Sequence, residues 1–255
     1  MKIAVLVKQV PDTETKIQVL DGKINEAGIK WAMNPYDEFA VEEALKLKEK
    51  LGQAEVIVFS AGPQRVVEAI RQALAMGADR GVRIDSTGLE LDPFTTASVL
   101  AKAVAEEQCQ IVFAGKQAID DDAQQVHIAV AELLKFAHAV PISKFEFIDA
   151  SKVKVDCPLA GGRKEVLEVS LPAVLGCDKG LNQPRYASLP GIMKAKTKPL
   201  KELKAADLLG DTKALTQNAN YALPPEGRRN KIIPGSASEA AQELVRLLRE
   251  EAKVI

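Results

Sequence analysis

Apolar and polar residues alternate along the first half of the chain in a way that predicts strands and helices in turn. Residues 2–8, 54–60, 82–84 and 111–114 are short apolar runs, as in strands covered on both faces of a parallel sheet. Helical spacing between them predicts helices from Pro35 to Gly52, from Pro63 to Gly77, from Pro93 onward and from about Ala123 to Phe136. Asn34 is expected to cap the first helix. The alternation predicts a Rossmann-like α/β fold, with a mostly parallel sheet and helices on both faces.

After Pro141 the period of the pattern changes from helical to two. Residues 144–147, 152–155 and 165–169 alternate strictly, with turns expected at 149–151 and 160–162 and a last buried strand at 172–176. This predicts an antiparallel extension of the sheet with one face exposed to water. Near the start of the chain, Asp21–Gly22 is the expected turn of a weak hairpin.

Regular patterns mostly fail between residues 178 and 234, where six prolines interrupt long polar stretches. Because so long an irregular segment is uncommon in a compact domain, we expect an arm that lies on another protein. Residues 237–252 are helical again, with an apolar stripe of Leu244, Leu247 and Leu248 beside Val245 that suits a partner groove. The predicted division is an α/β domain over 1–177, and a loop and arm over 178–255.

The composition excludes several classes of function. The net charge is −1 and 4% of residues are aromatic, which argues against nucleic-acid binding. The first apolar run is too short for a signal peptide, and none approaches the roughly 18 residues of a membrane helix, so we expect a cytoplasmic chain without membrane insertion. The cysteines Cys109, Cys157 and Cys177 lack metal-site spacing, which favours buried free thiols over a metal or redox-sensing site.

Candidate ligand-binding segments follow the expected strand ends. These are residues 9–13, 60–63 and 115–125, and ligands bind at such ends in open α/β sheets. Backbone amides at the start of the helix near Ala123 are suited to a phosphate. Asp120, Asp121 and Asp122 would repel that phosphate, or alternatively would cap the helix. No dinucleotide or P-loop glycine motif, nucleophile elbow or metalloprotease motif occurs, and no residue is predicted to be catalytic or to bind a metal.

An apolar group within a basic segment is the candidate docking loop. Residues 185–204 hold six basic residues against one glutamate, a local charge of +5. Leu189, Ile192 and Met193 are apolar in a loop that we expect to be exposed. An apolar anchor with a cationic rim is typical of a protein-docking surface. A basic loop that folds back over its own domain is the alternative.

Several motifs together resemble the β subunit of the electron transfer flavoproteins, and the resemblance runs nearly end to end. The motifs are residues 7–12 (VKQVPD), 34–44 (NPYDEFAVEEA), 75–80 (AMGADR), 115–122 (GKQAIDDD), 182–186 (NQPRY) and 189–196 (LPGIMKAK). The resemblance implies a heterodimer with a larger α subunit that holds most of a redox-active FAD, and an electron carrier that takes electrons from flavin dehydrogenases such as acyl-CoA dehydrogenases. It implies that residues 178–255 pack on the α subunit.

The resemblance also implies the sites. A structural AMP would bind at Leu6, Asn34, Pro35, Tyr36, Asp37, Ala61, Gly115, Lys116, Gln117, Ala118, Ile119, Asp120, Asp121, Asp122, Ala123, Gln124, Gln125 and Val126. Tyr36 and Thr13 would approach the flavin ring. The docking residues would be Leu189, Pro190, Ile192, Met193, Lys194 and Lys196, with Leu189 as the anchor.

Two alternatives to this function remain open. Some members of the family hold a second FAD in place of AMP and bifurcate electrons from NADH, with a Gly and a Thr in the acidic stretch and a Gly-Pro after it. Here Asp121, Ala123 and His127–Ile128 stand at those positions, and we expect Asp121 and His127 to crowd a second flavin. Val126 and His127 also differ from the AMP-binding pattern. The other alternative is a stand-alone adenine-nucleotide-binding protein of the stress-protein type.

Overall fold

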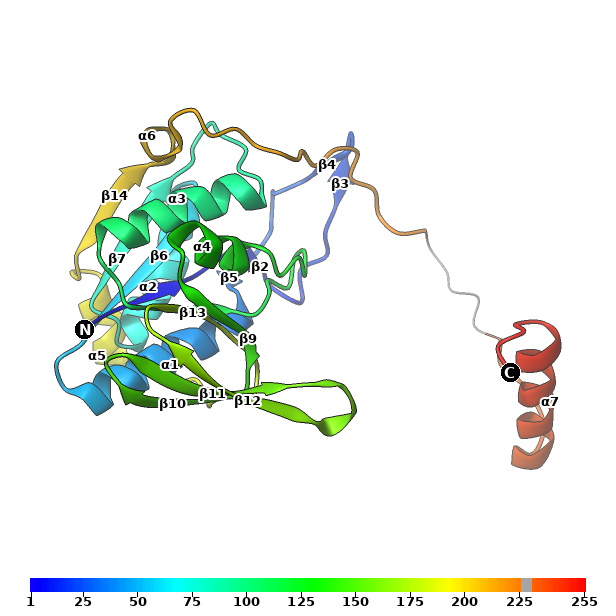
Figure 1. Ribbon diagram of the computed structural model, residues 1–255. Helices are drawn as coiled ribbons and strands as arrows, with labels where there is room; N and C mark the ends of the chain where they lie inside the picture. The colour runs from blue at the N-terminus through cyan, green and yellow to red at the C-terminus, as the bar shows by residue number, and fades with distance from the viewer. Residues whose placement is uncertain (226–230) are drawn as a thin grey trace. The chain divides into compact units, whose positions relative to one another are not determined.

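A parallel sheet forms the centre of the computed structural model, which describes residues 1–225 and 231–255 (Figure 1). The chain divides into a main unit, residues 1–17 with 26–219, and a second unit, residues 18–25 with 220–255. Among the described residues, seven strands of the main unit pair in parallel, in the order β14 (Leu200–Lys204), β7 (Arg80–Asp85), β6 (Glu55–Gly62), β1 (Lys2–Leu6), β8 (Ile111–Gly115), β13 (Ala173–Cys177) and β9 (Ala137–Ile142). The predicted fold class is therefore confirmed.

Helices cover both faces of this sheet. One face packs on α1 (Pro35–Leu51) and α2 (Val67–Met76), and the other on α3 (Pro93–Glu106) and α4 (Val126–Leu134). Successive residues of β1 serve the two faces in turn: Val5 belongs to the first core cluster, and Ala4 and Leu6 belong to the second. This double burial explains why the strands read as continuous apolar runs.

The period-two segments form an antiparallel sheet of their own. Its strands are β10 (Lys144–Asp149), β11 (Lys152–Pro158) and β12 (Lys164–Ser170), in that order. Val153 and Val155 join the core on one face, while Lys154 and Glu168 are exposed on the other, as the alternation predicts. Two short pairs complete the strands of the described residues: β2 (Gln9–Pro11) with β5 (Trp31–Met33), and β3 (Val19–Leu20) with β4 (Lys23–Ile24), the predicted hairpin.

The segment 178–234 is more ordered than its pattern predicts, which is a correction. It contains α5 (Leu189–Ala195), the edge strand β14 and α6 (Ala205–Leu209), all inside the main unit. The main unit therefore includes residues 178–219, which the pattern had assigned to the arm. β14 was missed because a five-residue strand with apolar side chains only at Leu200 and Leu203 carries little periodic signal.

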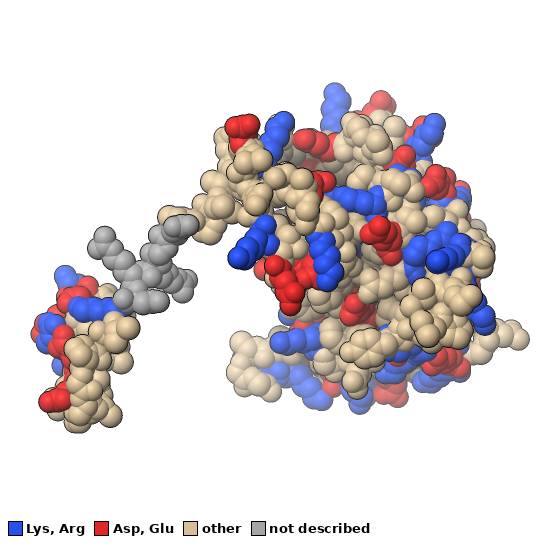
Figure 2. Space-filling view, turned by 180° about the vertical axis from the view of Figure 1, so that it is seen from behind, with Lys and Arg blue, Asp and Glu red and all other residues tan. Residues whose placement is uncertain are grey.

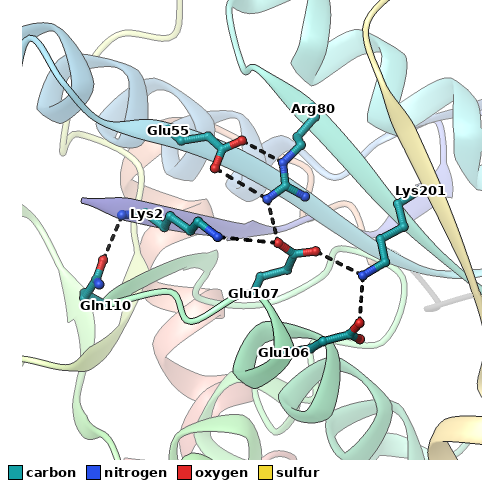
Figure 3. Close-up of polar contacts among 7 residues, drawn as sticks. All are labelled: Lys2, Glu55, Arg80, Glu106, Glu107, Gln110 and Lys201. Carbon is teal, nitrogen blue, oxygen red and sulfur yellow. Dashed lines mark hydrogen bonds and ion pairs between the residues drawn. The ribbon is translucent and has the colours of Figure 1, made fainter.

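A network of charged side chains ties this edge strand to the sheet at the amino ends of the strands (Figure 3). The guanidinium of Arg80 donates to Glu107 (2.6 Å) and Glu55 (2.7 Å), and Lys201 of β14 donates to Glu106 (2.9 Å) and Glu107 (3.2 Å). The hydrogen bonds with Glu107 and then Glu55 raise the pKa of Arg80. The shared Glu107 links β7, β14 and the carboxyl end of α3, so this edge of the sheet is held by charge as well as by backbone pairing.

The region of the predicted helix 123–136 differs from the expectation. The helix α4 begins only at Val126 and ends at Leu134, and Lys135 takes a left-handed conformation (φ 58°). The residues after it form β9, which includes His138 and pairs with β13 and which the pattern does not predict. A short apolar run does not separate helix from buried strand by period alone, which explains the error. Similarly, the expected helix from Pro63 begins as a 3₁₀ turn, η1 (Gln64–Val66), before α2.

The second unit contains the predicted terminal helix. The helix α7 (Ala237–Glu250) starts with a capping box, in which Ser236 and Glu239 satisfy each other's backbone N–H groups. Leu244 and Val245 are exposed on it, and Leu247 is buried. In the same unit the N–H of Tyr221 donates to the carbonyl of Gly22 (3.0 Å). The predicted helix is confirmed; its destination on a partner stays a prediction.

The three cysteines are free and buried, as expected. In residues 1–225 and 231–255, no three His, Cys, Asp or Glu side chains are grouped so that they could hold a metal ion. Within the same residues, no helix combines the length and the apolar character needed to cross a bilayer.

Candidate functional site

The predicted nucleotide-binding segments begin at the carboxyl ends of three neighbouring central strands. We call this end of the sheet the carboxyl edge. β1 lies between β6 and β8, with Leu6 opposite Phe59 on one side and Ala114 on the other. Ala61 lies two residues further along β6, and Gly115 ends β8. The structure therefore brings Leu6, Ala61 and Gly115 to one edge, the place where open α/β sheets bind ligands.

Asp37 is a buried carboxylate at this edge. Its Oδ2 accepts a hydrogen bond from the backbone N–H of Lys8 (2.7 Å), and its Oδ1 accepts from the N–H of Gly115 (3.1 Å) and the side-chain amide of Asn34 (2.9 Å). Burial raises the pKa of Asp37 to about 7, although these donors favour the charged form. A side chain at residue 115 would collide with Asp37 and Tyr36, which is why glycine is required there. Asp37 thus fixes β1, α1 and β8 to one another.

Asn34 ties the start of α1 to the loop that follows β8. Its side-chain nitrogen donates to the carbonyl of Gln117 (2.9 Å) as well as to Asp37, and its side-chain oxygen accepts from the N–H of Ile119 (3.2 Å). Asn34 occupies the N-cap position of α1, as predicted, but its side chain makes no capping hydrogen bond to the helix. The side chain is 1% exposed and finds its acceptor and donor partners across the edge, which makes it an anchor of the loop.

The acidic stretch does not cap α4. Asp120 and Asp121 both accept hydrogen bonds from the ammonium group of Lys8, at 2.8 and 3.0 Å. Burial lowers the pKa of Lys8, but the two carboxylates more than offset this and the pKa is raised. Gln125 precedes α4, and its side chain makes no capping bond. The helix therefore starts with amides that no side chain caps, while two of the acids that would repel an anion face a cation.

The loop between β8 and α4 is held by its own side chains. Gln117 donates to the carboxylate of Asp122 and accepts from the side chain of Gln124 (2.9 Å), and the carbonyl of Ala118 accepts from the N–H of Asp122 (2.9 Å). Asp122 and Gln124 have left-handed backbones, with φ of 49° and 55°. Such conformations are uncommon outside glycine, and the hydrogen bonds within the loop hold them in place.

The predicted nucleotide-binding residues fall into four groups in space. Leu6 and Ala61 lie at strand ends; Asn34, Pro35, Tyr36 and Asp37 lie at the start of α1; Gly115, Lys116, Gln117, Ala118, Ile119, Asp120, Asp121, Asp122, Ala123 and Gln124 form the end of β8 and the loop; Gln125 and Val126 begin α4. Hydrogen bonds connect the second group to the third through Asn34 and Asp37. Ala61 lies on the far side of β1 from the loop.

Two further polar residues at this edge, Lys8 and Ser60, are not among the residues implied for AMP, although Ser60 lies in the candidate segment 60–63. Lys8 binds the acidic stretch, and a cation at the carboxyl end of the first apolar run, with three acids after the end of another, is a signal that could have found it. Ser60 lies near the carboxyl end of β6, and among the described residues its buried hydroxyl oxygen has no hydrogen-bond partner. Lys116 pairs with Asp178 (3.0 Å) and lies 5.2 Å from the centre of the Tyr36 ring.

His127, in the first turn of α4, is buried. Its side chain is buried beneath α4, its ring centre is 5.7 Å from that of His138, and it lies close to Gly176 of β13. Burial, and then His138, lower the pKa of His127 to about 4. The expectation that His127 crowds a second flavin stays a prediction.

The predicted docking residues lie on the short helix α5, except Lys196, which follows it directly; α5 lies near the amino ends of the parallel strands. α5 packs on α2 close to the start of the chain (Figure 1), and Ser188 caps it by accepting from the N–H of Gly191 (3.1 Å). Leu189 is 79% exposed and Met193 is 72% exposed, and Ile192 is also exposed. The exposed apolar group that the sequence predicts is present.

The basic rim around this group is smaller than the charge count suggests. Arg185 is bound to Glu42 (2.8 Å) and Glu49 (2.6 Å), and these hydrogen bonds raise its pKa. Lys198 donates to backbone carbonyls and Lys201 to the network of Figure 3. Figure 2 shows acidic and basic side chains mixed over the face of the main unit that it presents. Lys194 and Lys196 are the predicted docking lysines that remain exposed, and Lys204 is exposed as well, so half of the six basic residues bind to the body of the main unit.

Comparison with known proteins agrees with the resemblance. The family described as "Electron transfer flavoprotein domain" matches residues 21–208. The chain is 41% identical over 258 residues to the "Electron transfer flavoprotein subunit beta, mitochondrial" of Arabidopsis thaliana, and 39% identical over 260 residues to the "Electron transfer flavoprotein subunit beta" of Bacillus subtilis (strain 168). Both alignments cover all of each chain. A relative from Bradyrhizobium diazoefficiens is 42% identical. The chain therefore belongs to the family of electron transfer flavoprotein β subunits, which are electron-carrier subunits.

Proposed function

We propose that this chain pairs with an electron transfer flavoprotein α subunit, binds a structural AMP at the carboxyl edge of its sheet, and docks to flavin dehydrogenases through α5. The observation that carries the AMP proposal is the uncapped start of α4 beside acids already paired with Lys8. Such a helix start favours a phosphate through its free amides and its dipole.

The remaining residues of the edge also fit an AMP. The loop 116–125 is tied to α1 through Asn34, so its amides are held in place before a ligand arrives. Gly115 lets the backbone approach closely, and the unpartnered hydroxyl of Ser60 offers a hydrogen bond. These residues hold and orient a nucleotide.

The electron-transfer chemistry in this proposal comes from the FAD, which carries electrons when bound mainly by the α subunit. The chain's own contribution is to bind and to orient. The second unit supports the pairing with the α subunit, because α7 exposes the apolar residues Leu244 and Val245, and such residues are stabilised in a partner groove. Tyr36 and Thr13 are the proposed residues on the flavin side.

The nucleotide in the β site can be identified directly. The chain is purified with its α subunit, the cofactors are released by heat, and they are measured by mass spectrometry and absorbance. We expect one FAD and one AMP per heterodimer. Two FAD per heterodimer would contradict the AMP proposal in favour of a bifurcating subunit, and a homodimer that retains ATP without an α subunit would support the stand-alone alternative.

The docking role of α5 is tested by Leu189→Ala in the heterodimer. Burying one leucine in a partner's pocket is worth about 1.5–3 kcal/mol, so its loss should raise the apparent KM for the dehydrogenase about tenfold or more. FAD content and melting temperature should stay unchanged because Leu189 is exposed. The matched control is Leu159→Ala, an exposed leucine beyond β11 on the antiparallel sheet. Normal kinetics for Leu189→Ala, or equal effects of both variants, would remove α5 from the docking role.

A further inference from the structure

The helix α5 sits directly on the carboxyl end of α2. Gly191 faces the carbonyl of Ala75 so closely that a Cβ at residue 191 would lie 2.5 Å from that oxygen. Ala195 is buried at the other end of α5. A helix of seven residues is not stable in isolation, so α5 depends on what anchors it to α2.

Two basic side chains cross between these helices in opposite directions. Arg71 of α2 donates through Nη1 to the carbonyls of Ala195 (2.5 Å) and Lys198 (2.8 Å), which end and follow α5. Lys198 in turn donates through Nζ to the carbonyls of Leu74 (2.9 Å) and Ala78 (2.5 Å), at the end of α2. Each helix is thus capped at its carboxyl end by a cation from the other's side of the contact.

The lysine of this reciprocal clamp is held by carbonyl oxygens. The nearby carboxylate of Asp79 is bound to Lys48 (2.5 Å) and to the N–H of Val56 (2.8 Å). Burial lowers the pKa of Lys198. Burying part of the Lys198 ammonium group costs free energy unless its hydrogen bonds to the carbonyls of Leu74 and Ala78 are kept. Keeping these bonds restricts α5 to one orientation on α2.

That orientation determines which side chains reach a partner. With Gly191 and Ala195 against α2, Leu189 and Met193 lie on the outer side of α5 and are exposed. Preorganised apolar side chains bind with a smaller entropy cost than mobile ones. Without the hydrogen bonds of Arg71 and Lys198, α5 would no longer be fixed on α2. Leu189 and Met193 would then not be held together on its exposed side.

We propose that Arg71 and Lys198 are positioning residues of the docking surface, which fix α5 so that Leu189 and Met193 are presented to the dehydrogenase. This inference rests on the proposed docking function of α5. Neither side chain needs to touch the partner, because both act through the backbone of α5 and the residues after it.

The experiment uses heterodimers that carry Arg71→Met or Lys198→Met. The matched control is Lys102→Met, because Lys102 of α3 also donates to a helix carbonyl, that of Leu208 in α6 (2.5 Å), on the other face of the sheet. We expect both clamp variants to raise the apparent KM for the dehydrogenase about tenfold, with kcat at saturation unchanged. Amide hydrogen exchange in residues 189–195 should be faster in both variants than in wild type. Arg71→Lys, which keeps the positive charge, should have a KM between those of wild type and Arg71→Met. Lys102→Met should change neither quantity.

The outcomes separate the clamp from the docking proposal. If Leu189→Ala raises KM but the clamp variants leave both KM and the exchange of 189–195 unchanged, the clamp proposal is wrong. If the clamp variants accelerate the exchange while KM stays normal in them and in Leu189→Ala, the docking function itself is wrong. If kcat and flavin content both decrease in the clamp variants and in Lys102→Met, the substitutions cause a general loss of structure, and the positioning role is wrong.

Discussion

Replacing Asn34 with alanine is expected to cost about 2–4 kcal/mol of folding free energy and to release most of the bound nucleotide. The change removes three hydrogen bonds and leaves the carbonyl of Gln117 and the N–H of Ile119 without their buried partner. Each buried group left unpaired costs about 1–3 kcal/mol. Since Asn34 is the link between α1 and the loop 116–125, the loop amides should also lose their fixed arrangement.

The measurement is a urea unfolding curve of the heterodimer, together with the AMP released per heterodimer after purification. The control is Asn218→Ala, which removes the same side chain from an exposed position in the main unit. We expect a lower unfolding midpoint and less than a tenth of the nucleotide for Asn34→Ala, with both unchanged for the control. A variant that keeps its full nucleotide content would show that Asn34 does not organise the site.

Acidification below pH 6.5 is expected to destabilise the main unit through His127. The pKa of His127 is lowered from 6.5 to about 4 in the folded chain, first by burial and then by His138. Between pH 6.5 and about pH 4, His127 is therefore mostly protonated in the unfolded chain and mostly neutral in the folded chain. This contribution to stability is complete above pH 6.5 and is lost as the pH falls toward 4. The difference corresponds to about 3 kcal/mol.

The comparison that isolates this effect is wild type against His127→Leu, unfolded by urea at pH 7.5 and at pH 4.5. Asp37 contributes in the opposite sense, because its raised pKa adds stability as the pH falls below about 7, but it is present in both proteins. We expect the free energy of unfolding of wild type to fall more than that of the variant by about 2–3 kcal/mol. An equal fall in both proteins would assign the acid sensitivity to other groups.

The repeated strands and helices could be predicted because their patterns are local. The runs at β1, β6 and β8 are apolar on both faces, and α1 and α3 carry proline at their first turn. β14 and β9 could not be predicted in the same way. Both are short, and both are strands because they complete the edges of a sheet whose other members lie far away in the sequence.

The candidate site was predicted as a set of residues, but the interactions within it were not. The acids 120–122 suggested a helix cap or repulsion of phosphate, and the structure pairs two of them with Lys8, more than a hundred residues earlier in the chain. Asn34 precedes a helix in the pattern of a cap, yet its partners lie in another loop. Side chains at the ends of two strands that are distant in the sequence come into contact only when the sheet forms. A local sequence motif therefore does not predict such contacts.

The loop 116–125 lies at the carboxyl ends of the parallel strands, whereas α5 lies near their amino ends and packs on α2. Separate sets of hydrogen bonds hold the loop and the helix. Substitutions that change one set leave the bonds of the other intact. Under the proposed function, partner choice and cofactor retention depend on separate parts of the subunit and can therefore change independently during evolution. We therefore expect that exchanging residues 185–198 between relatives changes the redox partner at the proposed docking surface and leaves the proposed nucleotide site unchanged.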